Sequence, residues 1–282
     1  MIDFVKMHGI GNDYVYIERL NGDIPADIPE LARRMSDRNF GIGGDGIVLI
    51  VPSELKDAHC RMRMFNPDGS EAEMCGNAIR CVAKLVHDDG CISENPLRIE
   101  TGAGLLVLEL NVEDGLVRSV RVDMGPPRFS PAEIGMTLKD SRALDMPLSV
   151  DRREFKINCV SMGNPHAVIF IDEPVDDFAV EHYGPLIEND PLFTNRTNVE
   201  FVNVLGPQLL RQRTWERGAG ETLACGTGAS AVGVAAVLTG RVKPGEMTIR
   251  LNGGELKIEW TESGNVFKTG PAEEVFRGSW PE

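Results

Sequence analysis

Residues 216–240, ERGAGETLACGTGASAVGVAAVLTG, combine a glycine-rich approach, a cysteine and a run of small apolar residues. The run from Ala229 predicts a helix that ends at Gly240, because glycine readily adopts the left-handed conformation that follows a helix. Cys225 stands at the predicted helix start, next to free backbone N–H groups and the positive end of the helix dipole. Both features favour a thiolate and an anion bound beside it. The alternative is that Cys225 is a small buried hydrophobic residue, as most cysteines are.

The chain contains a second copy of this pattern. In residues 73–86, EMCGNAIRCVAKLV, Cys75 precedes an apolar-periodic run that ends near Gly90, and it lies 150 positions before Cys225. Three further pairs recur in the same order at nearly the same offset: 11–17 (GNDYVYI) with 163–169 (GNPHAVI), 65–66 (FN) with 215–216 (WE), and 98–104 (RIETGAG) with 249–254 (IRLNGG). The matches predict an ancient duplication, with two similar domains that each present one thiol at a helix N-terminus.

Composition and breaks in the pattern predict the domain limits. A chain of 282 residues suits two domains that each bury a core. Gly125-Pro126-Pro127 is the first plausible linker, and Gly270-Pro271 ends the second domain. We expect residues 1–124 and 271–282 to form an N-terminal domain carrying Cys75, and residues 125–270 to form a C-terminal domain carrying Cys225. Residues 128–150 read as irregular.

Charge and cysteine content limit the expected partners and indicate a reducing compartment. The formal net charge of −14 disfavours nucleic acid and anionic membranes as partners. Six cysteines in a chain of this length do not resemble a disulfide framework. No apolar run approaches the ~18 residues of a membrane span, and the first residues lack the features of a signal peptide. We therefore expect a cytoplasmic protein with free thiols.

One glycine motif is misleading. Gly41, Gly43 and Gly46 satisfy the G-x-G-x-x-G pattern of dinucleotide-binding proteins. That pattern requires a strand before it and a helix after it, whereas here the predicted helix comes first and the strand follows. The glycines therefore predict a backbone turn.

Two thiols at two helix starts suggest a chemistry. If both faced one cleft, a thiolate could remove a proton from a carbon centre while a thiol delivered a proton to the opposite face. One member must hold its proton while the other lacks it, which a shared site encourages. Backbone N–H groups at Gly76-Asn77 and Gly226-Thr227 could stabilise a substrate carboxylate and the charge that develops on it. Such a site needs no cofactor.

Cysteine, histidine and lysine side chains also serve in metal, redox and pyridoxal sites. A metal site would show Cys-x-x-Cys or His/Cys clusters, and no such spacing is present. A redox dithiol requires that the two sulfurs lie very close. Lys6, near Asn12, has no phosphate-binding context for a pyridoxal cofactor. For His166, beside Asn164, we expect an accessory positioning or hydrogen-bonding role. The other four cysteines are expected to be structural: Cys60, Cys81, Cys91 and Cys159.

At these residues the chain resembles diaminopimelate epimerase. The matching segments span nearly the whole chain in the family's order: 4–13 (FVKMHGIGND), 65–70 (FNPDGS), 74–77 (MCGN), 163–166 (GNPH), Asn198, 216–218 (ERG) and 224–228 (ACGTG). The resemblance implies a mixed α/β (α+β) fold of two pseudo-symmetric domains. Each domain would be a mostly antiparallel sheet wrapped around a central helix, with the active site in the interdomain cleft. It also implies a homodimer.

The implied activity is the cofactor-independent conversion of L,L-diaminopimelate to its meso form, for lysine and peptidoglycan synthesis. Cys75 would be the base toward the L,L substrate and Cys225 the acid. The remaining site residues carried over by the resemblance are Gly76, Asn77, Gly226 and Thr227 for the reacting carboxylate, Arg217 for the distal carboxylate, Asn66, Asn164, Asn198 and Glu216 for the distal amino acid end, and Asn12 lining the cleft.

Departures from the family pattern are few. Gly46 stands where some members carry Gln, so no contact is carried over there, and Tyr14 replaces a common Phe. One rival is a proline racemase or hydroxyproline epimerase. The motif at the first thiol of that family resembles Cys-Gly-His, where this chain has Cys75-Gly76-Asn77. The other rival is a non-catalytic thiol protein that binds an amino acid.

Overall fold

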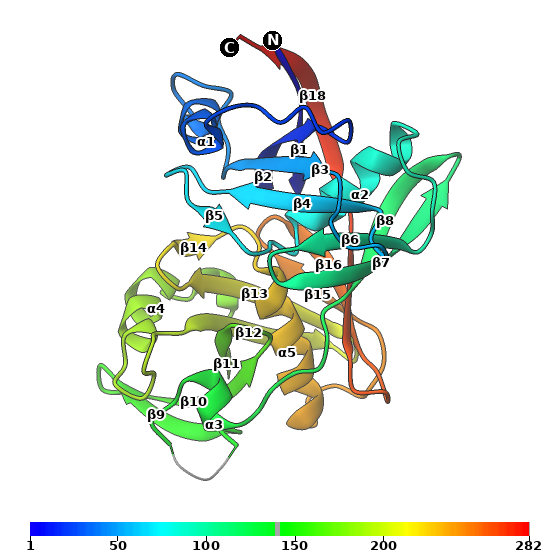
Figure 1. Cartoon of the computed structure of the whole chain (residues 1–282). Helices are drawn as coiled ribbons and strands as arrows, with labels where there is room; N and C mark the ends of the chain where they lie inside the picture. Colours follow the sequence, from blue (N-terminus) through cyan, green and yellow to red (C-terminus); the bar gives the residue numbers. More distant parts are fainter. Residues whose placement is uncertain (139–141, 282) are drawn as a thin grey trace. The chain divides into compact units, whose positions relative to one another are not determined.

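The computed structural model describes residues 1–138 and 142–281 (Figure 1). The chain forms two compact units: unit 1 comprises residues 1–122 and 269–282, and unit 2 comprises residues 123–268. The domain limits predicted from the sequence lie two residues further along the chain at each boundary. Among the described residues, no helix combines the length and the apolar character needed to cross a bilayer.

Unit 1 is a mixed sheet with two helices. Its elements are β1 (Ile2–Gly9), β2 (Asn12–Glu18), α1 (Ile28–Ser36), β3 (Ile47–Val51), β4 (Cys60–Phe65), β5 (Glu71–Ala72), α2 (Ala78–Asp88), β6 (Leu97–Thr101), β7 (Gly104–Glu113) and β18 (Glu273–Trp280). Strand β8 (Leu116–Asp123) leads from unit 1 into unit 2. The C-terminal strand β18 pairs antiparallel with β1, so the two ends of the chain share one sheet (Figure 1).

Unit 2 repeats this arrangement. Its elements are α3 (Pro131–Ile134), β9 (Met146–Val150), β10 (Arg153–Ser161), β11 (Pro165–Phe170), the 3-10 turn η1 (Val175–Asp177), α4 (Val180–Glu188), β12 (Asn198–Gly206), β13 (Leu209–Glu216), β14 (Gly220–Thr222), α5 (Gly226–Leu238), β15 (Met247–Leu251) and β16 (Gly254–Trp260). Strand β17 (Val266–Gly270) returns to unit 1.

Strand pairing shows the duplication directly. In unit 1, β1–β2 is antiparallel, β2–β3 parallel, β3–β4 antiparallel, β4–β6 parallel and β6–β7 antiparallel. In unit 2, β10–β11, β11–β12, β12–β13, β13–β15 and β15–β16 follow the same order of directions. Each unit also places its thiol-bearing loop between a short strand and its buried helix.

The central helix of unit 2 is apolar on every side, which is the pattern of a helix buried all round. Helix α5 packs against β10, β11, β12, β15 and β16. An added Cβ at Gly233 would lie 2.7 Å from Ile258 Cγ2, so helix and sheet approach closely there. The predicted helix end is confirmed, since Gly240 has φ 69°, and Gly90 after α2 has the same φ.

Two further sequence expectations have clear outcomes. The G-x-G-x-x-G stretch lies between α1 and β3 and no helix follows it, as expected for a backbone turn. The expectation that residues 128–150 are irregular is wrong for Pro131–Ile134 and Met146–Val150. Ser130 caps α3 by accepting from Glu133 N, and Met146–Val150 form β9 against β10. Residues 139–141 of that segment lie outside the described residues.

Candidate active site

Cys225 is the N-cap residue of α5 and its side chain is buried. Its carbonyl accepts the first helical hydrogen bond, from Ala229 N at 2.9 Å. Its sulfur lies 3.6 Å from the Thr227 hydroxyl. The glycine-rich approach therefore delivers the thiol to the first turn of the helix, as the sequence predicts.

Other influences on Cys225 oppose the helix start, which by itself favours a thiolate. Burial raises the pKa of Cys225 well above its ordinary value, and the nearby Glu216 and Glu200 carboxylates raise it further. Hydrogen bonds from Thr227 and Gly228 N lower the pKa of Cys225, but by less. Desolvation and the two carboxylates therefore favour the protonated thiol.

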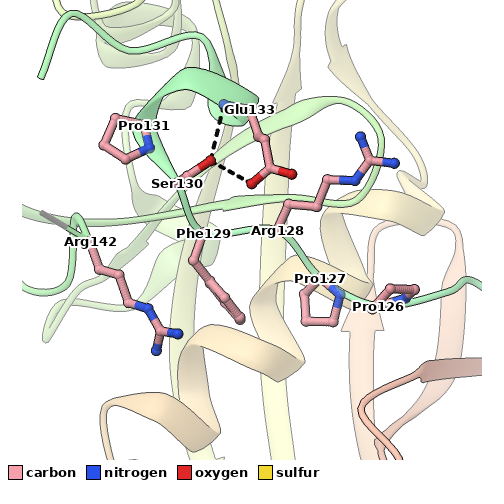
Figure 2. Close-up of a pocket in the computed structure, with 8 residues that line it drawn as sticks. All are labelled: Pro126, Pro127, Arg128, Phe129, Ser130, Pro131, Glu133 and Arg142. Carbon is pink, nitrogen blue, oxygen red and sulfur yellow. Dashed lines mark hydrogen bonds between the residues drawn. The ribbon is translucent and has the colours of Figure 1, made fainter. Parts of the chain in front are cut away.

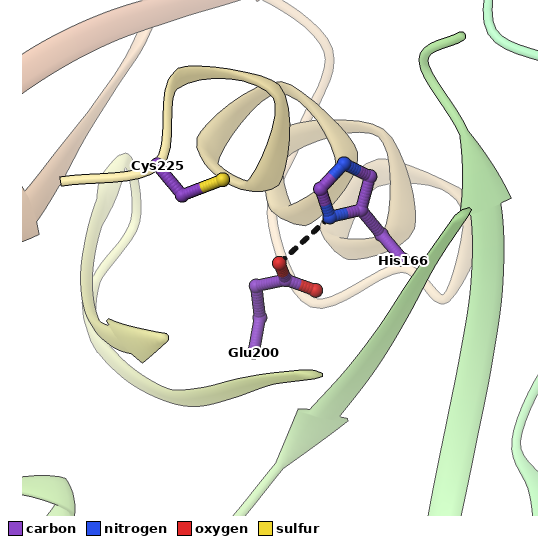
Figure 3. A group of neighbouring side chains, drawn as sticks. All are labelled: His166, Glu200 and Cys225. Atoms are coloured by element: carbon purple, nitrogen blue, oxygen red, sulfur yellow. Dashed lines mark hydrogen bonds and ion pairs between the residues drawn. The ribbon is translucent and has the colours of Figure 1, made fainter. Parts of the chain in front are cut away.

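A buried dyad lies beside the Cys225 sulfur. His166 and Glu200 come from the adjacent parallel strands β11 and β12, and His166 Nδ1 lies 2.7 Å from Glu200 Oε1 (Figure 3). His166 Nε2 lies 3.0 Å from Asn164 Oδ1, and Asn164 Nδ2 donates to Thr227 Oγ1 at 3.2 Å. These contacts link Glu200, through His166 and Asn164, to Thr227, whose hydroxyl lies beside the Cys225 sulfur.

These side chains also resemble a metal-binding group. One ligand atom from each of His166, Glu200 and Cys225 lies within 4.8 Å of the others. The 2.7 Å between Nδ1 and Oε1 is a hydrogen-bond distance. Two ligands of one tetrahedral zinc ion would lie roughly 3.3 Å apart, given bonds of ~2.0–2.1 Å. The geometry therefore favours a hydrogen-bonded dyad.

Cys75 occupies the equivalent place before α2. Its carbonyl accepts from Ile79 N at 3.1 Å, which repeats the bond from Ala229 to Cys225. Unlike Cys225, its side chain is only partly buried. The Cys75 sulfur donates to Asn12 Oδ1 at 3.2 Å, and Asn12 Nδ2 donates to Asp45 Oδ2 at 2.7 Å. The structure thus brings together two of the site residues predicted for unit 1.

The backbone after Cys75 is held by a buried arginine. Arg80 Nη1 donates to Gly76 O at 3.0 Å and to Asn77 Oδ1 at 2.9 Å. The Asn77 side chain is buried. Asn66 belongs to the neighbouring turn, where its Nδ2 donates to Ser70 Oγ at 3.0 Å. Arg80 therefore fixes the peptide groups predicted to bind a carboxylate.

The remaining predicted residues of unit 2 bind one another or their own loop. Asn198 accepts from Arg217 N at 2.9 Å and donates to Pro165 O at 2.8 Å. The Arg217 guanidinium donates to Asn195 O at 3.1 Å. Glu216 accepts from the Thr222 hydroxyl at 2.6 Å. Asn198 thereby links the start of β11 to the loop after β13.

Comparison with known proteins decides the family. A sequence model of diaminopimelate epimerase matches residues 4–130 and 158–275. Three proteins named diaminopimelate epimerase are close relatives. They come from Acetivibrio thermocellus (53% identity, 98% of this chain, 97% of that protein), Moorella thermoacetica (51%, 99%, 99%) and Methanococcus maripaludis (49%, 98%, 98%). The chain belongs to the diaminopimelate epimerase family. It is accordingly an isomerase of the epimerase type.

Solved structures agree on the fold. A hydroxyproline epimerase from Agrobacterium vitis matches with a TM-score of 0.68 at 18% identity, covering 98% of this chain and 90% of that one. A PhzF-family protein from Bacillus anthracis matches with a TM-score of 0.71 at 16% identity, covering 100% and 99%. At such identities only the mixed α/β fold is shared. The full-length relatives at about 50% identity do not favour the proline racemase alternative.

Lys6, the other four cysteines and a surface groove of unit 2 lie in distinct surroundings. Lys6 is buried and forms an ion pair with Asp13 at 2.5 Å, which gives it a structural role. Of the four cysteines expected to be structural, Cys60, Cys81 and Cys159 are buried and Cys91 is exposed. A surface groove in unit 2 is lined by Arg128, Phe129 and Arg142 among others (Figure 2). None of the predicted site residues lines that groove.

Three residues near the thiols were not predicted from the sequence. Glu200 and Arg80 are fully buried ionisable residues, and Tyr14 is buried with its hydroxyl in hydrogen-bonding reach of Cys75. Glu200 sits in the apolar-looking stretch 199–204, and Arg80 sits in a helix, where charged residues usually face solvent. The internal repeat gave a signal for Tyr14, because Tyr14 aligns with His166, for which an accessory role is expected.

Proposed function

We propose that this chain interconverts L,L-diaminopimelate and meso-diaminopimelate by a two-base mechanism in which Cys75 and Cys225 are the catalytic residues. One thiolate removes the α-proton and the other thiol delivers a proton to the opposite face of the carbon. The thiol and thiolate forms exchange between the two cysteines, so no electrons are gained or lost. In the L,L-to-meso direction Cys75 is the base and Cys225 is the acid.

One observation carries the proposal. In each unit the carbonyl of a cysteine near the start of the buried helix accepts the N–H group four residues later. Cys225 is the N-cap of α5, and Cys75 lies two residues before Asn77, the N-cap of α2. The difference in burial between the thiols supports the roles, since burial raises the pKa of Cys225 and so favours its protonated form. Full-length relatives that bear the name diaminopimelate epimerase support the substrate.

The substrate contacts follow from the same proposal. Backbone N–H groups of Gly76, Asn77, Gly226 and Thr227 would bind the reacting carboxylate and stabilise the developing negative charge. Arg217 would pair with the distal carboxylate, to which a guanidinium fork is suited. Asn66, Asn164, Asn198 and Glu216 would hold the distal amino acid group, and Asn12 would line the site. We further propose a cytoplasmic homodimer that needs no metal or cofactor and serves lysine and peptidoglycan synthesis.

Solvent deuterium exchange tests this function. The purified chain is incubated with L,L-diaminopimelate in deuterated water, α-deuterium is followed by mass spectrometry, and isomers are separated on a chiral phase. We expect deuterium in the meso product, and loss of exchange by at least about a thousandfold in Cys75→Ala and Cys225→Ala. Cys60→Ala is the matched control, because it removes a buried thiol away from both helix starts. Exchange with L-proline or hydroxyproline but not with diaminopimelate would contradict the proposal.

A further inference from the structure

The last residue of α4 is a buried glutamate that the proposed mechanism does not use. Glu188 is 4% exposed. Its Oε2 accepts from Trp215 Nε1 at 2.7 Å, and its Oε1 accepts from Gly218 N at 2.9 Å and from Arg196 Nη1 at 3.0 Å. A buried carboxylate needs donors that replace the water it loses. Here those donors all come from outside α4.

Two of the donors lie beside residues that are proposed to hold the distal end of the substrate. Gly218 directly follows Arg217, and Arg196 stands two residues before Asn198. Asn198 accepts from Arg217 N at 2.9 Å, so the two loops also bond to each other. Glu188 therefore joins the loop before β12 to the loop after β13, next to the residues that would contact the substrate.

Both loops turn through left-handed backbone conformations. Gly218 has φ 77°, and Arg196 has φ 57°, which residues with a side chain seldom adopt. An added Cβ at Gly218 would lie 3.6 Å from Arg196 Nη2, so the guanidinium lies against the other turn. Such conformations persist where surrounding contacts hold them. The bonds from Glu188 supply a contact of this kind to both turns.

The carboxylate also distinguishes the two arginines of these loops by charge. Arg196 forms an ion pair with Glu188, whereas no described acidic side chain forms an ion pair with Arg217. The Arg217 guanidinium donates instead to a backbone carbonyl, Asn195 O, at 3.1 Å. The charge of Arg217 is therefore available to a substrate carboxylate, while that of Arg196 is neutralised within the protein.

Close packing of α4 gives the carboxylate a rigid support. An added Cβ at Gly184, on the same helix, would lie 2.5 Å from Trp215 Cγ, so the helix meets the indole directly. Trp215 in turn packs against the apolar core of unit 2. The place of Glu188 is thus set by the helix and the core. A binding group that is supported in this way is held in its binding geometry before the ligand arrives.

We propose that Glu188 is a positioning residue for the distal end of the substrate, which it serves by holding the Arg217 loop in place and by neutralising Arg196. The inference rests on the proposed function, in which Arg217 meets the distal carboxylate. It gives α4 a part in recognising substrates that carry a charged amino acid group at their far end.

Steady-state kinetics of Glu188→Gln test the inference. Glutamine keeps the size of the side chain, but its NH2 group faces a donor, so at least one of the bonds is lost. We expect KM for L,L-diaminopimelate to rise at least about tenfold and kcat to change less than about threefold, because the reacting α-carbon lies at the other end of the substrate. Glu181→Gln, an exposed position on the same helix, is the matched control and should change neither constant. An unchanged KM in folded Glu188→Gln would overturn the inference.

A double-mutant cycle with Arg217→Ala separates positioning from general support of the fold. If Glu188 acts through Arg217, Glu188→Gln should change kcat/KM less than about twofold once Arg217 is alanine. The same tenfold loss in both backgrounds would show that Glu188 supports the fold alone, and the inference would fail.

Residue-level hydrogen exchange tests the contact without turnover. Gly218 lies in an exposed turn, yet its amide donates to Glu188. We expect this amide in the wild type to exchange at least about tenfold more slowly than in an unstructured peptide. Glu188→Ala, which removes the acceptor, should abolish that protection and leave α5 protected. An unprotected Gly218 amide in the wild type would contradict the inference, including where a Glu188 variant does not fold.

The two proposals fail separately. Wild-type turnover of diaminopimelate with an unchanged KM in Glu188→Gln would overturn this inference and leave the proposed function standing. Absence of α-deuterium in wild-type incubations would overturn the proposed function, whereas the protection of the Gly218 amide still decides whether Glu188 holds the loop.

Discussion

The effect of the Tyr14 hydroxyl on Cys75 can be isolated, because phenylalanine removes the hydroxyl and keeps the ring. Burial raises the pKa of Tyr14 far above its ordinary value, and the charge of Cys75 raises it further, so the phenol stays protonated and can donate. We expect Tyr14→Phe to slow alkylation of Cys75 at pH 7 about fivefold, because one hydrogen bond to the thiolate is worth about 1 kcal/mol. Tyr183→Phe, in the aromatic cluster of unit 2, is the control. An unchanged Cys75 rate would show that the phenol does not stabilise the thiolate.

Asp88 illustrates how one carboxylate couples stability to pH. Burial alone would raise the pKa of Asp88, but bonds from Lys84, Val117 N and His87 hold it below its ordinary value. Since the folded pKa is lowered, its contribution is present above about pH 4 and is lost as the pH falls through the folded pKa. We expect Asp88→Asn to reduce the free energy of unfolding by about 1–3 kcal/mol at pH 7.

Urea unfolding at pH 7 and at pH 3 measures this effect. The difference between wild type and Asp88→Asn should shrink at pH 3, where the wild-type carboxyl is being protonated. Asp23→Asn, an exposed position, serves as the control. A difference of the same size at both pH values would rule out the carboxylate as its source.

At the scale of elements, the packing of α5 depends on a glycine inside the helix. Alanine at position 233 would improve helix propensity by about 1 kcal/mol, but its Cβ would lie 2.7 Å from Ile258 Cγ2 on β16. Overpacking of this kind costs about 1–3 kcal/mol, so we expect Gly233→Ala to lower the free energy of unfolding. A double-mutant cycle with Ile258→Ala identifies the contact. The alanine should be less costly in that background, and strict additivity would place the strain elsewhere.

At the scale of the whole molecule, the chain end completes the sheet of unit 1. Strand β18 pairs with β1 from Ile2 to His8, and the Phe4 and Phe276 rings meet at 5.9 Å. Removing residues 271–282 also removes Pro271 O, which accepts from the buried Arg80. We expect this truncation to abolish protection of β1 and α2 peptides in hydrogen-exchange mass spectrometry, while α5 peptides stay protected. Retained protection of β1 would show that the sheet does not need its last strand.

The sequence by itself determined the repeat, the two thiols at helix starts and the ends of both helices at Gly90 and Gly240. These features are local, because glycine conformation, helix termini and apolar periodicity act within a few residues. The resemblance carried by short motifs then indicated the family, which full-length relatives confirmed.

Only the tertiary structure decided the surroundings of each thiol. A helix start by itself favours a thiolate, yet burial and the nearby Glu216 and Glu200 carboxylates raise the pKa of Cys225. Glu200 reaches Cys225 because β12 pairs with β11 and α5 packs over both strands. Electrostatic effects on a buried group depend on which distant residues share its low-dielectric surroundings, and strand pairing rather than sequence distance sets those neighbours.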